Sequence, residues 1–124
     1  MMAKQWNIYT RVNKEDLKEM RRLVRLFLEQ RLRNTKGTWV MVTLKRFKSF
    51  LRRRRIKSPI LERIKKHSRI HYALFWKVVF DYLKERGLPY ILLKERYYKG
   101  KLFDRKILII LREEDIQRGD IYGL

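Results

Sequence analysis

The chain offers one kind of chemistry most plainly, the binding of anions by guanidinium and ammonium groups. Residues 30–61 contain eleven basic residues and no acidic one. The densest part is Arg52–Arg55, at the end of an apolar pattern with helical spacing. One or two cations would offset a helix dipole at that position. Four exceed that need, so the interpretation we favour is phosphate binding. The eleven are Arg31, Arg33, Lys36, Lys45, Arg46, Lys48, Arg52, Arg53, Arg54, Arg55 and Lys57.

The charge of the whole chain points to the same class of partner. Its 33 Lys and Arg residues against 13 Asp and Glu residues give a formal net charge of +20. A field of that strength repels itself unless a polyanion neutralises it, and nucleic acid is the usual polyanion. A membrane surface is the weaker alternative. Residues 113–120 reverse the sign, which predicts one basic binding face and an acidic tail held away from it.

Other site chemistries have little support in the sequence. The chain has no Cys, which excludes disulfides, a thiolate nucleophile and a Cys-based zinc site. Its two His residues, His67 and His71, lack a third ligand nearby, so we expect no metal. The acidic residues Asp81, Glu95 and Asp104 stand among basic ones and are typical of ion pairs rather than of acid–base catalysis. We expect no enzyme, no cofactor and no small-molecule substrate.

The length of 124 residues with 45% hydrophobic residues fits one globular domain. No apolar run reaches the length of a signal peptide or a membrane span. The expectation is therefore a soluble, intracellular protein, cytoplasmic or nucleoid-associated. The many Arg and Lys residues would also suit a thermophile.

The N-terminal half predicts a strand and three helices. Residues 6–12 alternate as a short strand, and Asn13 caps a helix that runs to Leu32. Residues 38–54 fit a single helix capped by Thr38, although residues 39–42 could instead be a buried strand. Ser58-Pro59 starts a short helix that ends near Lys66.

The C-terminal half predicts a long helix and a hairpin. The helix runs from Arg69 to Arg86 and ends at Gly87. Two apolar stripes leave a narrow outward line, namely Arg69, Ala73, Lys77, Asp81 and Lys84. Strands at 90–98 and 102–111 meet at Lys99-Gly100-Lys101, in a loop that we expect to exceed two residues.

Aromatic residues raise a second hypothesis. The helical stripes place Trp39 and Trp76 in the core. Tyr97 and Tyr98 are adjacent, so one of them should face outward beside the hairpin tip, where it could stack on an unpaired base.

The pieces SPILERIKK, HSR, IHYALFWKVVFDYLKERG and YILLKERYYKGKLFDRKILII come in a recognisable order. Residues 38–112 resemble a winged helix-turn-helix domain: a helix, a vestigial strand near Ile56, a second helix, a recognition helix and a wing. The departure is the missing long first strand, which leaves a two-stranded wing. The resemblance implies an α+β, mostly helical fold, with an added N-terminal strand and helix and a C-terminal hairpin wing.

The resemblance also implies that the N-terminal half of the third helix enters the major groove of DNA. Carried over to this chain, that indicates Ser68, Arg69, His71 and Lys77, with Arg69 as the candidate for reading guanine. The wing would contact the backbone through Arg96, Tyr98, Lys99, Lys101 and Arg105. The basic stretch adds Arg46, Arg52, Arg53, Arg54, Arg55, Lys57 and Lys66.

The sequence therefore predicts a non-enzymatic protein that binds duplex DNA as a transcriptional regulator or as a chromatin or viral accessory factor. Alternatives are an RNA-binding or ribosome-associated protein and a single-stranded DNA-binding protein. Residues 1–35 would pack on the domain or form a homodimer, residues 36–112 would bind nucleic acid, and residues 113–124 would be the acidic tail.

Overall fold

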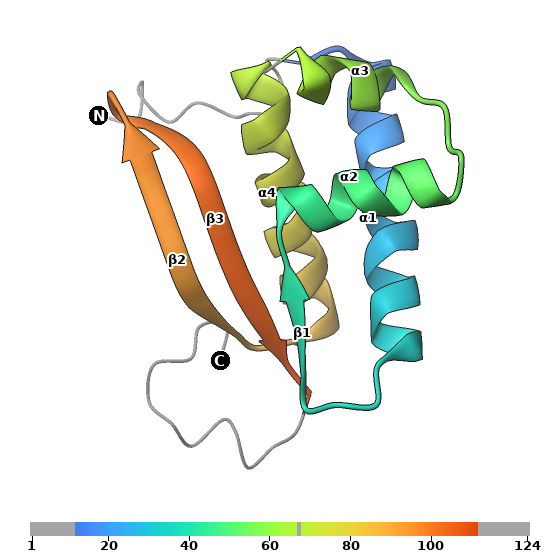
Figure 1. Cartoon of the computed structure of the whole chain (residues 1–124), viewed down its shortest axis with the longest axis vertical. Helices are drawn as coiled ribbons and strands as arrows, with labels where there is room; N and C mark the ends of the chain where they lie inside the picture. The colour runs from blue at the N-terminus through green and yellow to red at the C-terminus, as the bar shows by residue number, and fades with distance from the viewer. Residues whose placement is uncertain (1–11, 67, 112–124) are drawn as a thin grey trace.

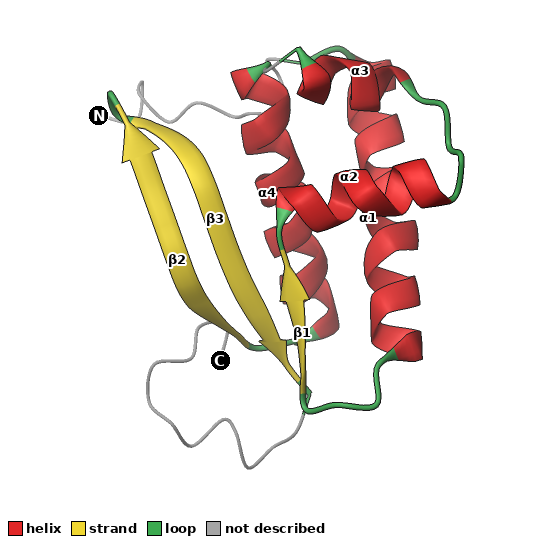
Figure 2. Ribbon diagram, viewed as in Figure 1, coloured by secondary structure: helices red, strands yellow, loops and turns green. Residues whose placement is uncertain are grey.

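A computed structural model describes residues 12–66 and 68–111. Helices dominate, and a three-stranded antiparallel sheet stands at one side of them (Figures 1 and 2). This confirms the α+β, mostly helical class. The strand expected at 6–12 and the acidic tail lie outside the described residues, apart from Val12. The elements in chain order are α1 Lys14–Asn34, β1 Trp39–Val42, α2 Leu44–Arg53, α3 Pro59–Lys65, α4 Arg69–Arg86, β2 Tyr90–Tyr98 and β3 Lys101–Ile110.

Helix α1 begins as its sequence predicts. The Asn13 side chain accepts a hydrogen bond from the Asp16 backbone N–H at 2.7 Å and so caps the helix. The predicted apolar stripe is buried against the rest of this same chain, with Met20, Val24 and Phe27 in the core. The apolar stripe of α1 therefore belongs to the same hydrophobic core as the other described helices and the sheet.

The single helix expected over residues 38–54 is wrong. Residues 39–42 form β1, in which Val40 and Val42 face the core, and Thr43 then caps α2 through a hydrogen bond from the Arg46 backbone N–H. Residues 39–42 form a strand and not a helix because they pair with β3. This partner is about 70 residues away in the sequence, so local periodicity cannot reveal it. Trp39, expected in the core, is consequently 46% exposed.

The sheet has the strand order β1-β3-β2. Its third strand lies at residues 39–42, which the sequence offered as the alternative to a helix, and the described residues near Ile56 form no strand. Strand β1 pairs only with residues 107–110 of β3, whereas β2 pairs along residues 101–109. Among the described residues, no strand pairs with residues 101–106 of β3 on the side of β1, and we call this part of the strand the open edge. At the tip of the hairpin, Lys99 and Gly100 connect β2 to β3 with φ angles of 50° and 77°. This loop has two residues and is therefore shorter than the sequence predicted.

Helix α4 is the centre of the core, behind α2 and between the sheet and α1 (Figure 2). A chain of ring contacts with centroid separations of 4.8–5.8 Å crosses the core from α1 to β2. Its members are Phe27, Phe47, Phe75, Trp76, Phe80 and Tyr90. Trp76 is core, as predicted, and the predicted outward line of α4 is also confirmed: its members are exposed or half-buried.

A buried polar cluster ties three helices together. Asp16 on α1 accepts hydrogen bonds from His71 Nε2 on α4 at 2.7 Å, and its Oδ2 lies 2.5 Å from Arg63 Nε on α3. The other ring nitrogen of His71, Nδ1, is hydrogen-bonded to the Ser68 hydroxyl at 2.6 Å. Within the cluster, both ring nitrogens of the buried His71 and the Oδ2 atom of the buried Asp16 have partners.

Helix α2 ends in an unusual way. The Arg55 N–H bonds to the Arg52 carbonyl and the Ile56 N–H bonds to the Leu51 carbonyl, which is the Schellman pattern. The left-handed residue of such an ending is commonly Gly, but here it is Arg55 with φ of 55°.

We predict that Asp16→Ala lowers the free energy of unfolding by about 1–3 kcal/mol, because His71 and Arg63 lose their shared acceptor. The matched control is Glu15→Ala, at an exposed position one residue away, which should change it by less than about 0.5 kcal/mol. Urea unfolding followed by circular dichroism measures both. Equal effects of the two substitutions would contradict a structural role for the cluster.

We also predict that Arg55→Gly raises the free energy of unfolding by about 1 kcal/mol, because Gly adopts the left-handed conformation without the steric penalty of a Cβ atom. Arg54→Gly, at a residue with ordinary right-handed backbone angles, should not stabilise the protein. Thermal unfolding of both variants tests this, and a lower stability for Arg55→Gly would show that the left-handed backbone carries no strain.

Candidate nucleic-acid interface

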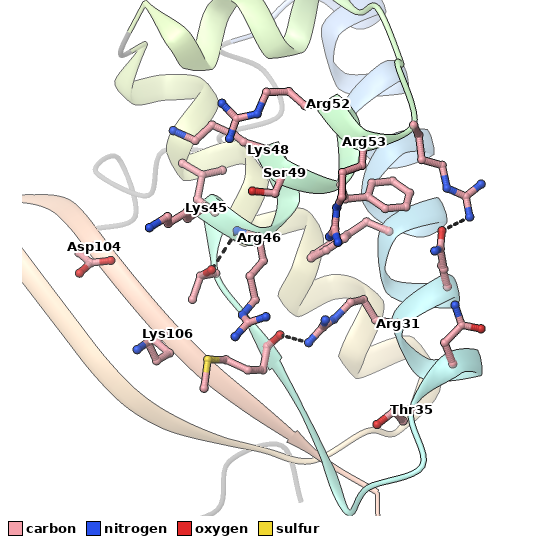
Figure 3. Close-up of a pocket in the computed structure, with 18 of the residues that line it drawn as sticks. Arg31, Thr35, Lys45, Arg46, Lys48, Ser49, Arg52, Arg53, Asp104 and Lys106 are labelled. Carbon is pink, nitrogen blue, oxygen red and sulfur yellow. Dashed lines mark hydrogen bonds between the residues drawn. The ribbon is translucent and has the colours of Figure 1, made fainter.

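A groove of about 1730 Å³ lies between α2, the C-terminal end of α1 and the hairpin β2–β3 (Figure 3). Its charged lining consists of ten basic residues and one acidic residue, Asp104. The basic ones are Arg31, Lys36, Lys45, Arg46, Lys48, Arg52, Arg53, Arg54, Lys94 and Lys106. The structure thus concentrates the positive charge on one concave surface.

Helix α2 supplies most of these cations because it is strongly amphipathic. Its apolar residues Leu44, Phe47, Phe50 and Leu51 are buried, and the opposite side carries Lys45, Arg46, Arg52 and Arg53, all exposed. No acidic residue occurs in the helix. Figure 3 shows these side chains spread along the length of α2 above the groove.

The hairpin β2–β3 forms the facing wall where β3 has its open edge. Because β1 stops at Val42, the segment of β3 that carries Asp104 and Lys106 borders the groove. Lys94 on β2 pairs with Asp104 at 2.9 Å. Tyr72 of α4 also lines the groove, and burial, followed by the charge of Asp104, raises the pKa of its hydroxyl.

Several cations elsewhere on the surface have acidic partners, whereas no ion pair among the described residues involves a cation of α2. The ion pairs among residues 12–66 and 68–111 include Lys77–Asp81 and Arg105–Glu95, and none of them involves α2. The prediction that Asp81, Glu95 and Asp104 are members of ion pairs is confirmed. Burial, and then the charges of Arg46 and Arg53, lower the pKa of Arg31.

The predicted contact residues fall into separate places. Arg46, Arg52, Arg53 and Arg54 line the groove, and Arg54 also donates to Gln30 and packs over Phe50. Other predicted contacts are exposed but do not line the groove, namely Arg55, Lys57, Lys66, Arg69, Lys77, Arg96, Tyr98 and Lys99. The side chain of Lys101 lies outside the described part of the chain.

Three of the predicted contacts need correction. His71 is only 8% exposed, and its ring and the Ser68 hydroxyl bond to each other inside the polar cluster, so both side chains have a structural role. Arg105 is turned inward: it pairs with Glu95 at 2.7 Å and stacks over the rings of Trp76 and Phe80.

Six basic residues of the groove were missing from the predicted site. Arg31, Lys36, Lys45 and Lys48 belong to the acid-free stretch 30–61, so composition could have found them. Lys94 and Lys106 face each other across β2 and β3 only because of a register shift after Leu92, and no local pattern signals that. One of Tyr97 and Tyr98 was expected to face outward, and the structure exposes both near the hairpin tip.

Other features give no competing site. No group of three or more His, Cys, Asp or Glu that could hold a metal occurs among the residues that the structure describes. Within the same residues, no helix combines the length and the apolar character needed to cross a membrane. Comparison with protein-family models, with curated proteins and with solved structures finds no match.

We predict that Arg105→Ala lowers the free energy of unfolding by roughly 1–2 kcal/mol, because the aliphatic stem and guanidinium cover Trp76 and Phe80. Arg105→Met keeps the apolar contact and should lose less. The control Arg96→Ala, on the exposed part of the wing, should change stability by less than about 0.5 kcal/mol. Urea unfolding measures the stability of all three variants. An unchanged free energy of unfolding in Arg105→Ala would contradict the structural role of Arg105 and leave it as a candidate for nucleic-acid contact.

Proposed function

We propose that this protein binds nucleic acid in the groove, with duplex DNA as the favoured ligand and without an enzymatic activity. The observation that carries the proposal is the row of cations on α2 that have no carboxylate partner among the described residues, facing a concave surface. Such a row loses free energy to mutual repulsion unless a polyanion neutralises it.

A nucleic-acid backbone suits this surface better than a membrane does. The cations line a groove with walls on both sides, α2 on one and β3 on the other, whereas a bilayer presents a broad, flat sheet of charge. A phosphodiester chain is narrow enough to enter a groove, and Lys and Arg side chains along it contact successive phosphates. These contacts position the ligand and carry no sequence information.

The order of elements supports a winged-helix arrangement. From α1 onward the order is a helix, a strand, the two helices α2 and α3, the helix α4 and the hairpin β2–β3, which is the expected order with one additional helix before α4. In this arrangement α4 takes the place of the recognition helix and β2–β3 that of the wing. Arg69, exposed at the start of α4, stays the candidate for base reading. Because most of α4 is buried, α2 would carry the larger share of the phosphate contacts.

A second candidate is a single-stranded ligand, either RNA or DNA. Tyr97 and Tyr98 are 56% and 58% exposed, and Trp39 is exposed too. Exposed rings beside cations can stack on unpaired bases. However, Trp39 pairs with Ile110 and Tyr98 with Lys101, so the rings lie at opposite ends of β3. One short segment would not reach both, and this favours the duplex.

We predict a steep salt dependence of binding, with a log–log slope of about −0.9 for each phosphate neutralised. Replacing Lys45, Arg52 and Arg53 by Ala should weaken binding to all sequences alike and reduce the slope by about 3. Fluorescence anisotropy with duplex DNA, single-stranded DNA and structured RNA at several salt concentrations measures affinity, slope and preference together.

The matched control replaces Lys14, Lys18 and Lys84 by Ala, which removes the same charge from exposed positions outside the groove. We expect this control to keep most of the slope. Equal losses in the two triple variants would contradict the groove as the binding surface, and a wild-type slope near zero would contradict nucleic-acid binding itself. Tightest binding to a single strand would select the second candidate.

A further inference from the structure

We propose that Arg31, Arg46 and Arg53 form one phosphate-binding subsite on the floor of the groove. The inference rests on the proposed function, because it assigns the place where the groove holds the ligand most firmly. The phosphate would be an internal phosphodiester or a terminal phosphate of the nucleic acid, and the chemistry of recognition is the same for both.

Three elements bring the subsite together. Arg31 comes from the last turn of α1, and Arg46 and Arg53 are seven residues apart on α2, so they share one side of that helix. Figure 3 shows Arg31 and Arg46 directed toward each other beneath α2. Arg31 Nη2 donates to the Met41 carbonyl of β1 at 2.9 Å, which fixes its guanidinium in place.

The hydrogen bonds of Arg31 are incomplete. Its Nε is buried and has no hydrogen-bond partner in the part of the chain that the structure describes. A buried N–H without an acceptor is costly, and a charged one more so. An anion with several oxygens could accept from this Nε and from the neighbouring guanidinium groups together.

The charges around Arg31 point the same way. No carboxylate among the described residues pairs with Arg31, Arg46 or Arg53, and both neighbours disfavour the charged form of Arg31. Three such groups gathered without a counter-ion destabilise the empty protein. Planar guanidinium groups match the geometry of a phosphate, and one anion among them would replace repulsion by attraction.

The other cations of α2 are placed differently. Arg54 is held by Gln30 and Phe50. Lys45 lies on the side of α2 that faces β3, toward Asp104 (Figure 3). Lys45 thus offers a matched control: it is adjacent to Arg46, exposed like it, and lines the same groove, but it lies outside the proposed subsite.

The first test compares thermal unfolding in sodium phosphate and in sodium chloride at equal ionic strength and pH. We expect phosphate to raise the wild-type Tm by about 3–6 °C more than chloride does. Arg46→Met and Arg53→Met should abolish this difference and should raise the Tm in chloride, because they relieve repulsion. Lys45→Met should keep the difference, which separates specific binding from the general stabilising effect of phosphate.

A second measurement needs no variant. Titration with inorganic phosphate should shift the NMR signal of the Arg31 Nε–H and leave that of Arg22, which is already paired with Glu19, unchanged. In nucleic-acid binding, Arg46→Met should lose about tenfold in affinity and Lys45→Met only about twofold to threefold. Oligonucleotides with and without a 5′-phosphate then distinguish a terminal from an internal phosphate as the ligand.

The outcomes separate the two proposals. Equal stabilisation by phosphate and chloride, or equal losses in Arg46→Met and Lys45→Met, would overturn the subsite even if the protein binds nucleic acid. A phosphate-specific stabilisation that depends on Arg46, in a protein that binds no nucleic acid, would keep the subsite and overturn the proposed function.

Discussion

Strand β1 ends after four residues, and the shape of the proposed site depends on that length. Val40 and Val42 bury themselves against the core and pair with β3, but Thr43 then stops the strand by capping α2. A longer β1 would have covered β3 up to the hairpin tip. Because it does not, α2 turns away from the sheet and the space between the helix and β3 becomes the groove.

The polar groups of this protein are treated in two contrasting ways. Asp16 and His71 are buried, and their hydrogen bonds are satisfied within the cluster that joins α1, α3 and α4. On the groove floor, Arg31 keeps a buried Nε without a partner among the described residues. The hydrogen bonds of the first region stabilise the fold, whereas the unpaired N–H of the second region costs free energy. Such a local cost is typical of binding sites, where ligand binding offsets it.

Local signals in the sequence predicted the features that depend on neighbouring residues. Asn13 as a cap, the Ser58-Pro59 helix start and Gly87 as a helix end are all confirmed, since each involves hydrogen bonds within a few residues. The features that were missed depend on distant partners. Trp39 is exposed because β1 pairs with β3, and His71 is buried because its partner Asp16 lies 55 residues earlier. The stretch 30–61 contains eight of the ten basic residues of the groove, and only the sheet register brings in the other two, Lys94 and Lys106.

The open edge of β3 has a further consequence. No strand among residues 12–66 and 68–111 pairs with residues 101–106 on that side, and unpaired backbone N–H and C=O groups at such an edge can pair with another strand. Lys94, Asp104 and Lys106 place charges next to it, a common guard against aggregation. We infer that the same charged side chains support both solubility and ligand affinity. Light scattering by groove variants should then increase as these charges are removed. A redesign of this groove for a different ligand would therefore have to place other charged side chains beside residues 101–106, so that the edge of β3 does not pair with another strand.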